Sequence, residues 1–412
     1  MENRVVVTGM GVVSPVGNNL ETFWDSLKNG VSGIDTIKRF DATGLGVYLD
    51  GEVKDFNAKE YYDSVVDIRR SDLFMQYAIA AATQAVEDSK ILESDIDKDR
   101  FGVYVGSGIG GINTFCTEDK KFNEKGPERV SPFFIPMLIG NMAAGAVAIR
   151  FGATGPSLPV VTACATSSNT IGEAYRAIKH GYADAIIAGG SEASINELAM
   201  AGFVNCKALS QCENPEDGCV PFDKRRSGFI MAEGAGMVVL ESYESAVKRN
   251  AKIYAEVVGY GNTCDAYHVT APDPEGAGAI KAIKMAKEEA GITGKENLYI
   301  NAHGTSTPLN DVMETKALKA VFGEDAYKLH VSSTKSMTGH MLGAAGAVEF
   351  IAATLAVKEG IIPPTINYKC KDEECDLDYT VNEAVVCDLD FAMSSSLGFG
   401  GHNACVALKK FQ

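Results

Sequence analysis

The same order of strand-like runs and glycine-rich turns occurs twice along the chain. In the first half the run 101–105 leads into GSGIGG, PVVTACATSS then opens a helical pattern, and AIIAGG ends a further strand. In the second half the run 298–302 leads into HGTST, VSSTKSMTGH opens a helix of small residues, and CVALKKF follows near the end. Identity between the halves is weak, so the order of elements carries the inference. We predict a duplicated fold with halves 1–250 and 251–412, divided near Arg249–Lys252.

Short apolar runs alternate with helical patterns along the chain. Runs rich in β-branched residues are typical of buried strands, and their alternation with helices is typical of an α/β fold. We therefore predict an α/β protein. A helix is expected over Asp72–Asp88, and further strands of the first half are expected at Val5–Val7, Leu158–Val161, Ala185–Ala188 and Met237–Leu240.

The acidic balance of the chain argues against several classes of partner. Its 38 Lys and Arg residues stand against 54 Asp and Glu residues, which gives a net charge of −16. Nucleic acids and anionic membrane surfaces are bound through basic faces, so neither is expected as the main partner. An acidic protein partner would need a local basic patch.

Cysteine spacing and apolar content indicate the compartment. The ten cysteines form no C-x-x-C pair and no spacing that fits zinc, so no metal site is expected. No apolar run approaches the roughly 18 residues of a membrane helix, and MENRVVVTGM is too short for the apolar region of a signal peptide. We predict a reduced, soluble, cytoplasmic protein.

Gly106, Gly108 and Gly111 have the G-x-G-x-x-G spacing of dinucleotide-binding turns. The residues that follow, NTFCTEDKKFNEKGP, do not read as a helix leading to a second parallel strand that ends in an acid, which that fold requires. We therefore expect no nucleotide cofactor. The glycines instead indicate that the backbone passes close to a buried group.

The segment VTACATSSNTIGEAYRAIKHG predicts a nucleophile. Cys164 lies between an expected strand and a helix whose apolar positions recur at helical spacing over 171–178. A helix N-terminus offers unpaired N–H groups and the positive end of the helix dipole. Those conditions lower the pKa of a thiol, so we expect Cys164 to be reactive. The alternative, a buried and inert thiol, is accepted for Cys116, Cys264 and Cys405.

Two of the six histidines lie in glycine-rich turns after expected strands, His303 in NAHGTSTPLND and His340 in STKSMTGHMLGAAGAVE. Near a thiol, an imidazole can act as a base or, when neutral, donate an N–H group to a developing oxyanion. Lys335 and Glu349 flank His340. On a continuous helix Glu349 would point away from His340, so it is expected to hold Lys335 or to form an ordinary buried ion pair.

Near the C-terminus, SSSLGFGGHNACVAL places three glycines around Phe399. Glycine permits unusual backbone angles, so this loop could aim a backbone N–H at a reacting carbonyl group. The alternative is a tight turn before an edge strand. That alternative explains Gly398, Gly400 and Gly401 but not the exposed aromatic residue between them.

Together these motifs resemble the condensing enzymes of the thiolase superfamily, specifically the β-ketoacyl-acyl-carrier-protein synthases of type II fatty-acid synthesis. The resemblance covers essentially the whole chain. It rests on VVVTGMGVVSPVG, GSGIGG, TACATSSNTIGEA, GGSEA, PFDKRRSGFIMAEGAG, DAYHVTAP, NAHGTSTPLND, STKSMTGHMLGAAGAVE and GFGGHN, in the order of the family. It implies a thiolase-like fold in which two duplicated βαβαβαββ halves form a five-layered α-β-α-β-α core.

The resemblance implies a Cys-His-His triad, matched by Cys164, His303 and His340. Relatives that start from acetyl-coenzyme A have Asn in place of the second His, and thiolases have Cys, so this second His selects the elongating synthases. Lys335 matches the lysine of the family and Glu349 its partner carboxylate.

Further positions follow from the same resemblance. Asp311 and Glu314 match the carboxylates after GTSTP. The chain departs from the family pattern at Leu397, where many relatives have Phe, and at His402, where Thr is common. The motif position of His402 is that of a loop residue, so it is not expected to be catalytic.

The implied reaction joins an acyl-acyl-carrier-protein primer to malonyl-acyl-carrier-protein, releasing carbon dioxide and free carrier protein and giving 3-oxoacyl-acyl-carrier-protein. Cys164 would carry the acyl group, the N–H groups of Cys164 and Phe399 would hold the oxyanion, and His303 with His340 would bind the malonyl carbonyl. No resident cofactor is implied, because the carrier brings the phosphopantetheine, and a homodimer is expected. Two alternatives stay open: a polyketide or specialised-lipid ketosynthase, and a non-catalytic chain-length partner subunit, which the complete triad opposes.

The resemblance also implies which residues contact the substrate and the carrier protein. Ile109 would line the acyl pocket and limit its depth, and Phe399 would act as a movable gate over Cys164. Thr305 and Thr307 would bond the pantetheine amides. By motif position, the remaining substrate-binding residues are Phe229, His268 and Thr270. The residues expected to face the acidic carrier protein are Arg69, Arg70, Lys207 and Arg129.

Overall fold

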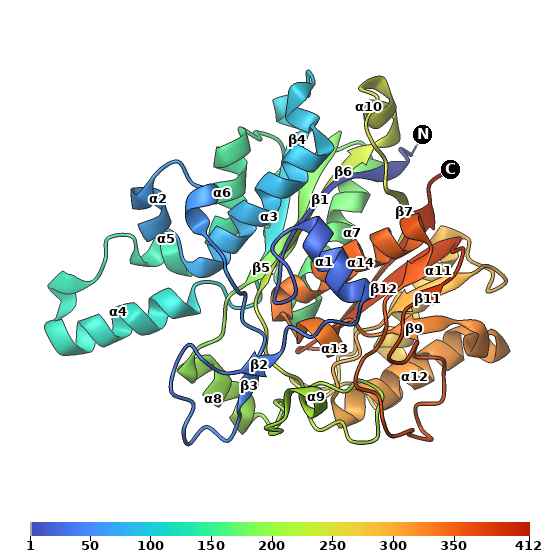
Figure 1. The fold of residues 1–412 in the computed structure, drawn as a ribbon. Helices are drawn as coiled ribbons and strands as arrows, with labels where there is room; N and C mark the ends of the chain where they lie inside the picture. The colour runs from blue at the N-terminus through green and yellow to red at the C-terminus, as the bar shows by residue number, and fades with distance from the viewer. Residues whose placement is uncertain (1) are drawn as a thin grey trace.

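The fold is built on a nine-stranded sheet with the order β4-β5-β6-β1-β7-β13-β12-β8-β9, seen in a computed structural model that describes residues 2–412 (Figure 1). Its strands are β1 (Val5–Val13), β4 (Phe101–Gly106), β5 (Ala185–Glu192), β6 (Gly234–Ser242), β7 (Ala255–Cys264), β8 (Leu298–Asn301), β9 (His330–Ser332), β12 (Phe391–Gly398) and β13 (His402–Lys410). Two short ribbons pair β2 (Asp35–Thr36) with β3 (Leu49–Asp50) and β10 (Ile361–Ile362) with β11 (Val385–Val386).

The helices fall into three layers around this sheet and several peripheral segments. The layer helices are α3 (Leu73–Ser89), α6 (Met142–Phe151), α7 (Thr166–Lys179), α11 (Ala277–Ala290), α12 (Pro308–Phe322) and α14 (Ala345–Glu359). The peripheral helices are α1 (Leu20–Lys28), α2 (Val65–Arg69), α4 (Ile112–Lys125), α5 (Phe134–Leu138), α8 (Glu197–Asn205), α9 (Pro215–Gly218), α10 (Tyr243–Lys248) and α13 (Lys335–Thr338).

The two halves of the sheet have the same topology. β1 pairs with β6, β6 with β5 and β5 with β4, and in the second half β7 pairs with β13, β13 with β12 and β12 with β8. In both halves the first two pairings are antiparallel and the third is parallel. β1 and β7 meet at the centre, where Val5–Val7 lies antiparallel to Ala255–Val257. The predicted duplication is confirmed in the order of strands, but only the second half has all five strands of the βαβαβαββ unit, because residues 2–250 contain no counterpart of β9 in the sheet. The expected division near Arg249–Lys252 falls between α10 and β7.

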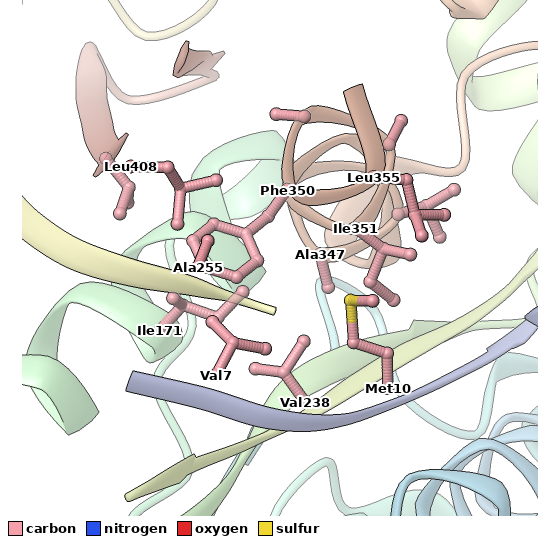
Figure 2. Packing of buried hydrophobic residues seen from close by; sticks show 14 of the residues in the cluster. Val7, Met10, Ile171, Val238, Ala255, Ala347, Phe350, Ile351, Leu355 and Leu408 are labelled. Atoms are coloured by element: carbon pink, nitrogen blue, oxygen red, sulfur yellow. The ribbon is translucent and has the colours of Figure 1, made fainter. Parts of the chain in front are cut away.

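Side chains alternate between two faces along the strands, which produces the layers. Val103 and Ile187 point into a core shared with α3 and α6, whereas Tyr104 and Ile186 point into a core shared with α7 and α14. The second half repeats this arrangement with α11 and α12 on its outer face. Figure 2 shows the central core, where Phe350, Ile351 and Leu355 of α14 pack over the sheet. The predicted five-layered α-β-α-β-α core is therefore confirmed.

The strand predicted at Leu158–Val161 is wrong. Only Ser157 forms a bridge, with Val103 of β4, and Leu158 N donates one further hydrogen bond to Val103 O. Pro159 has no N–H group to continue the ladder, so the segment stays irregular although it follows the edge of the sheet.

The segment after the glycine-rich turn is helical, contrary to expectation. Ile112–Lys125 forms α4, which projects from the body on the left of Figure 1 and leads into a short 3₁₀ turn and α5 rather than into a strand. Among the residues of α4, only Thr114 and Glu118 are buried, so most of its charged side chains are solvated. The argument against a dinucleotide site does not depend on this helix, because α4 does not lead directly into a parallel strand: α5, α6 and α7 come before β5, the next strand parallel to β4. Among residues 2–412, no helix is long and apolar enough to cross a membrane.

Candidate active site

Cys164 lies in a 3₁₀ turn that leads directly into α7. Ala163 has a φ of +51°, a left-handed conformation that is uncommon for a residue with a Cβ. Two hydrogen bonds fix the turn: Asn169 Nδ2 donates to Thr162 Oγ1 at 2.8 Å, and Thr162 N donates to Thr166 Oγ1 at 2.9 Å. The thiol is thus held at the N-terminus of a buried helix.

The hairpin between β12 and β13 packs against this turn. A Cβ on Gly398 would lie 2.7 Å from Thr162 O and 3.1 Å from Cys164 N, so glycine is needed for the approach. The backbone N–H of Phe399 donates toward the Cys164 sulfur, which favours the thiolate. Phe399 itself is half-buried, with its ring 6.2 Å from that of Phe203. β13 lies between β7 and β12, so the alternative of a turn before an edge strand is wrong.

His303 and His340 meet across one cavity. Their ring centroids are 5.4 Å apart and their planes cross at 87°. Both residues are buried, with 4% and 1% of their surface exposed. The ring of Phe229 packs edge-on against that of His340, at 5.0 Å. Both imidazoles and Cys164 line the same cavity of about 360 Å³, so the fold brings together three residues that are far apart in the sequence.

Burial decides the protonation of all three groups. Together with the positive charge of Lys335, it holds the pKa of His303 and of His340 well below 6.5, so both imidazoles are neutral at pH 7. Burial also raises the pKa of the Cys164 thiol to about 12, and Lys335 opposes this rise. The expectation of a low thiol pKa is therefore wrong for the resting site, because desolvation outweighs the favourable helix N-terminus.

Lys335 and Glu349 form a buried ion pair, with side chains 1% and 3% exposed. Lys335 Nζ donates a hydrogen bond to Glu349 Oε1, so Glu349 holds Lys335 as expected. The helix is not continuous, however: α13 ends at Thr338, His340 lies in the following turn, and α14 begins at Ala345. Burial raises the pKa of Glu349 to about 7, and the Lys335 charge opposes this rise. The pair therefore keeps a cation beside two neutral imidazoles.

A second buried carboxylate holds the loop that carries His303. Glu314 of α12 accepts hydrogen bonds from His303 N at 2.7 Å and from Gly304 N at 2.8 Å. Burial raises the pKa of Glu314 to about 7 against these bonds. The other carboxylate after GTSTP, Asp311, accepts a bond from Phe222 N at 2.8 Å. Both carboxylates thus hold backbone N–H groups of the surrounding loops in place.

Comparison with known proteins identifies the family. Residues 2–246 match the family model described as Beta-ketoacyl synthase, N-terminal domain, and residues 254–369 match Beta-ketoacyl synthase, C-terminal domain. The chain belongs to the β-ketoacyl synthase family. The 3-oxoacyl-[acyl-carrier-protein] synthase 2 of Staphylococcus aureus (strain N315) is 53% identical over 409 residues, which cover 99% of each chain. The protein of the same name from Synechocystis sp. is 49% identical over 412 residues, covering 100% of this chain and 99% of its own.

Solved ketosynthases share the fold over the whole chain. The ishigamide ketosynthase/chain length factor superposes with a TM-score of 0.93 at 35% identity, covering 100% of both chains. A ketosynthase bound to its type II polyketide acyl-carrier protein superposes with a TM-score of 0.91 at 34% identity, again over 100% of both chains. The thiolase-like fold and the condensing acyltransferase class are therefore established for this ketosynthase.

Most of the predicted substrate-binding residues line the cavity of this ketosynthase. Thr305 Oγ1 and Thr307 Oγ1 lie 3.0 Å apart on one wall. Three more of the predicted substrate-binding residues, Phe229, Thr270 and Phe399, also line the cavity. The cavity is therefore shared by the triad and by the residues expected to hold the pantetheine arm.

Two predicted substrate-binding residues lie outside that wall. His268 is exposed, and its Nδ1 accepts hydrogen bonds from Thr270 N at 3.1 Å and Ala271 N at 3.0 Å, so it shapes the loop at the rim. Ile109 is 39% exposed and does not line the cavity of the single chain. The contact of Ile109 with the acyl chain stays a prediction.

The residues expected to face the carrier protein divide into two groups. Lys207, at the end of α8, lines the mouth of the cavity. Arg69 and Arg70 at α2 and Arg129 after α4 are exposed but do not line it. The guanidinium of Arg70 stacks on the ring of Phe133 at 4.4 Å, so this arginine also packs. Docking by all four residues stays a prediction.

Sequence reasoning missed the hydrogen bonds that anchor the Phe399 hairpin. Asn403 Nδ2 donates to Asp265 Oδ1 at 2.8 Å and to Gly401 O at 3.1 Å. Gly400 N donates to Val269 O at 2.7 Å. Asp265 and Asn403 lie inside the motifs DAYHVTAP and GFGGHN, but they are 138 residues apart, and motif position alone does not pair them.

Proposed function

We propose that Cys164, His303 and His340 carry out the elongating condensation of acyl-acyl-carrier-protein with malonyl-acyl-carrier-protein in fatty-acid synthesis. The observation that carries this proposal is the convergence of a thiol at a helix N-terminus and two neutral, buried imidazoles on one cavity. A neutral imidazole can donate an N–H hydrogen bond to an oxygen on which negative charge develops, and the condensation creates such an oxygen in each of its two steps.

In the first step the Cys164 sulfur attacks the primer thioester. Because burial raises the pKa of this thiol to about 12, it is protonated at pH 7, and its proton must leave as the new carbon–sulfur bond forms. The thiol of the departing carrier takes up one proton, so the step is balanced. The N–H groups of Cys164 and Phe399 hold the oxygen of the tetrahedral intermediate.

In the second step malonyl-carrier protein enters the same cavity. His303 and His340 donate to its thioester carbonyl, which stabilises the enolate left when carbon dioxide departs. The enolate carbon attacks the acyl group on Cys164, the carbon–sulfur bond breaks, and the Cys164 sulfur takes up a proton. These steps use side chains and backbone N–H groups, and we propose that no resident cofactor or metal takes part.

Two alternatives are weaker. A non-catalytic chain-length partner would not need a thiol and two imidazoles on one cavity. A polyketide ketosynthase is supported by structures at 35% and 34% identity, whereas the curated fatty-acid relatives reach 53% and 49% over nearly the whole chain. The higher identity favours fatty-acid elongation.

The direct test is intact-protein and peptide mass spectrometry after incubation with acyl-carrier proteins of several chain lengths. We expect one acyl group, located on Cys164, and formation of 3-oxoacyl product after malonyl-carrier protein is added. Acylation of any of the other nine cysteines, with Cys164 free and condensation intact, would overturn the proposal.

We propose that an acidic acyl carrier protein docks on Lys207, Arg69 and Arg70, because a chain of net charge −16 repels it elsewhere. Reversing the three charges together is expected to raise the KM for acyl-carrier protein by about tenfold at low salt, and less at high salt, where charges are screened. Steady-state kinetics at two ionic strengths measure this. Alkylation of Cys164 by a small reagent should be unchanged.

Lys248→Glu is the matched control for docking, since Lys248 is exposed on α10, at the opposite end of the molecule from α8 in Figure 1. Its KM should match that of the unmodified protein. If the triple variant also keeps its KM, the carrier protein docks on another face.

We propose that the chain forms a homodimer through one apolar face. Large apolar side chains are exposed on and around the projecting α4 segment and beyond the β4 edge of the sheet. They are Phe115 (40%), Phe122 (50%), Ile135 (54%), Ile139 (40%), Ile149 (81%), Leu158 (44%) and Val161 (56%). A second copy would remove this surface from water.

Replacing Phe122 and Ile135 together with Asp is expected to shift the protein from dimer to monomer in sedimentation velocity, because buried charge opposes association. Val247→Asp on α10 is the control, since Val247 is similarly exposed at 53% but lies outside this face. A dimer that survives the double substitution would place the interface elsewhere.

A further inference from the structure

The carboxylate at the end of β5 has an unusual set of partners. Glu192 has no exposed surface, and its two oxygens accept five hydrogen bonds from uncharged groups. The donors are Ser107 Oγ (3.2 Å), Gly108 N (2.9 Å), Ile109 N (3.2 Å), Ser194 Oγ (3.0 Å) and Gly343 N (3.1 Å). A buried carboxylate with this many donors organises the segments that supply them.

Those segments converge from three parts of the fold. A Cβ on Gly108 would lie 2.7 Å from Glu192 Oε2 and 3.6 Å from Ala163 O, the carbonyl next to the Cys164 turn. A Cβ on Gly343 would lie 2.4 Å from Gly108 N, and Gly343 follows His340 by three residues. Glycines are therefore required for the loops to reach the carboxylate. The buried group expected behind GSGIGG is Glu192.

Glu192 differs from buried acids that only stabilise the fold. Glu241 is equally buried, but it is paired with the Arg249 guanidinium at 2.8 Å. Glu192 relies on neutral donors and lies close enough to the nucleophile that its charge raises the pKa of the Cys164 thiol. Burial also raises the pKa of Glu192 itself, against the bonds from Gly343, Ser194, Ile109 and Gly108.

We infer that Glu192 is a positioning residue for condensation. It binds Gly343, in the turn that follows His340, and Gly108, whose loop lies against Ala163 in the turn that carries Cys164. This inference rests on the proposed roles of Cys164 and His340. A displacement of about 1 Å between reacting groups can cost about 10²-fold in rate. A carboxylate that holds the loop beside Cys164 and the turn after His340 therefore affects turnover without touching the substrate.

The test is Glu192→Gln, which keeps the shape of the side chain, removes its charge and replaces one acceptor oxygen with an NH2 group that cannot accept a hydrogen bond. We expect kcat for condensation to fall at least about tenfold with little change in the KM for carrier protein. Because a nearby negative charge is lost, alkylation of Cys164 by iodoacetamide at pH 8, followed at this residue by mass spectrometry, should become about tenfold faster.

Glu241→Gln is the matched control, because it also removes one buried carboxylate charge. It is expected to lower the melting temperature while leaving the alkylation rate of Cys164 unchanged. If Glu192→Gln lowers kcat no more than Glu241→Gln does, or if Cys164 is alkylated at the unmodified rate, Glu192 only stabilises the fold and the inference is wrong.

If Glu192→Gln does not fold, Ser194→Ala tests the positioning role of Glu192 instead. It keeps the charge and removes one hydroxyl donor, so kcat should fall several-fold while the alkylation rate stays normal, and an unchanged kcat would overturn the inference. Acylation of Cys164 in the unmodified protein tests the proposed function separately, so the two failures can be told apart.

Discussion

Replacing Cys164 with Ala is expected to separate the two steps of the reaction. Condensation should fall by about 10⁶-fold, the loss measured when an enzyme nucleophile is removed, because no acyl-enzyme can form. Decarboxylation of malonyl-carrier protein should persist, because His303, His340 and Lys335 are untouched. The measurement compares carbon dioxide released without primer to 3-oxoacyl product formed with primer.

Cys405→Ala is the control for this experiment. Cys405 is a fully buried residue of β13, and its replacement removes packing contacts but no group that takes part in the reaction. Condensation should therefore be retained. Loss of decarboxylation in Cys164→Ala, or condensation that survives it, would contradict the division of roles between thiol and imidazoles.

The architecture could be predicted because local patterns repeat. The alternation of strands and helices predicted an α/β fold, and its repetition predicted the duplication. The βαβαβαββ unit and the five layers followed only from the resemblance to the β-ketoacyl synthases. Asp72 is an example of a local signal: it begins the expected helix, and its side chain caps α3 by accepting a hydrogen bond from Phe74 N. The placement of Cys164 at the start of α7 followed from the same kind of pattern.

The errors arose where one residue or the surroundings overrode the local pattern. The apolar run 158–161 reads as a strand, but Pro159 interrupts the ladder. The helix α4 reads as an irregular polar segment because it packs so few of its side chains. The raised pKa of Cys164 depends on desolvation by residues from distant parts of the chain and on the charges of Lys335, Glu192 and Glu349, which no local pattern reports.

Contacts across the chain were the least accessible to sequence reasoning. Glu192 and Gly343 are 151 residues apart, and Lys335 could be matched with Glu349 only because the two lie 14 residues apart in one motif. The GGSEA and GSGIGG motifs both contribute to the Glu192 junction, yet each motif alone reads as a turn. Motifs therefore identified the reacting groups, and the fold was needed to identify the groups that position them.

Replacing either His303 or His340 with Ala is expected to remove the decarboxylation that Cys164→Ala retains. Each substitution deletes one N–H donor to the enolate oxygen, which costs about 10²- to 10³-fold in rate. Carbon dioxide release from malonyl-carrier protein measures this directly. His330→Ala is the control, because the His330 imidazole is partly exposed and lies outside the cavity, with its Nδ1 3.1 Å from Asp378 Oδ2.

The rate of decarboxylation is expected to depend on pH in a way that reports the protonation of His303 and His340. Burial and Lys335 hold the pKa of both imidazoles well below 6.5, so the neutral donors persist as the pH falls through 6.5 and decarboxylation should show no acid limb there. Replacing Lys335 with Met and Glu349 with Gln together removes the nearby cation without stranding a carboxylate. The pKa of the imidazoles should then rise, and the acid limb should move to higher pH. An acid limb at 6.5 in the unmodified protein, or full decarboxylation by His340→Ala, would show that the imidazoles do not act as neutral donors.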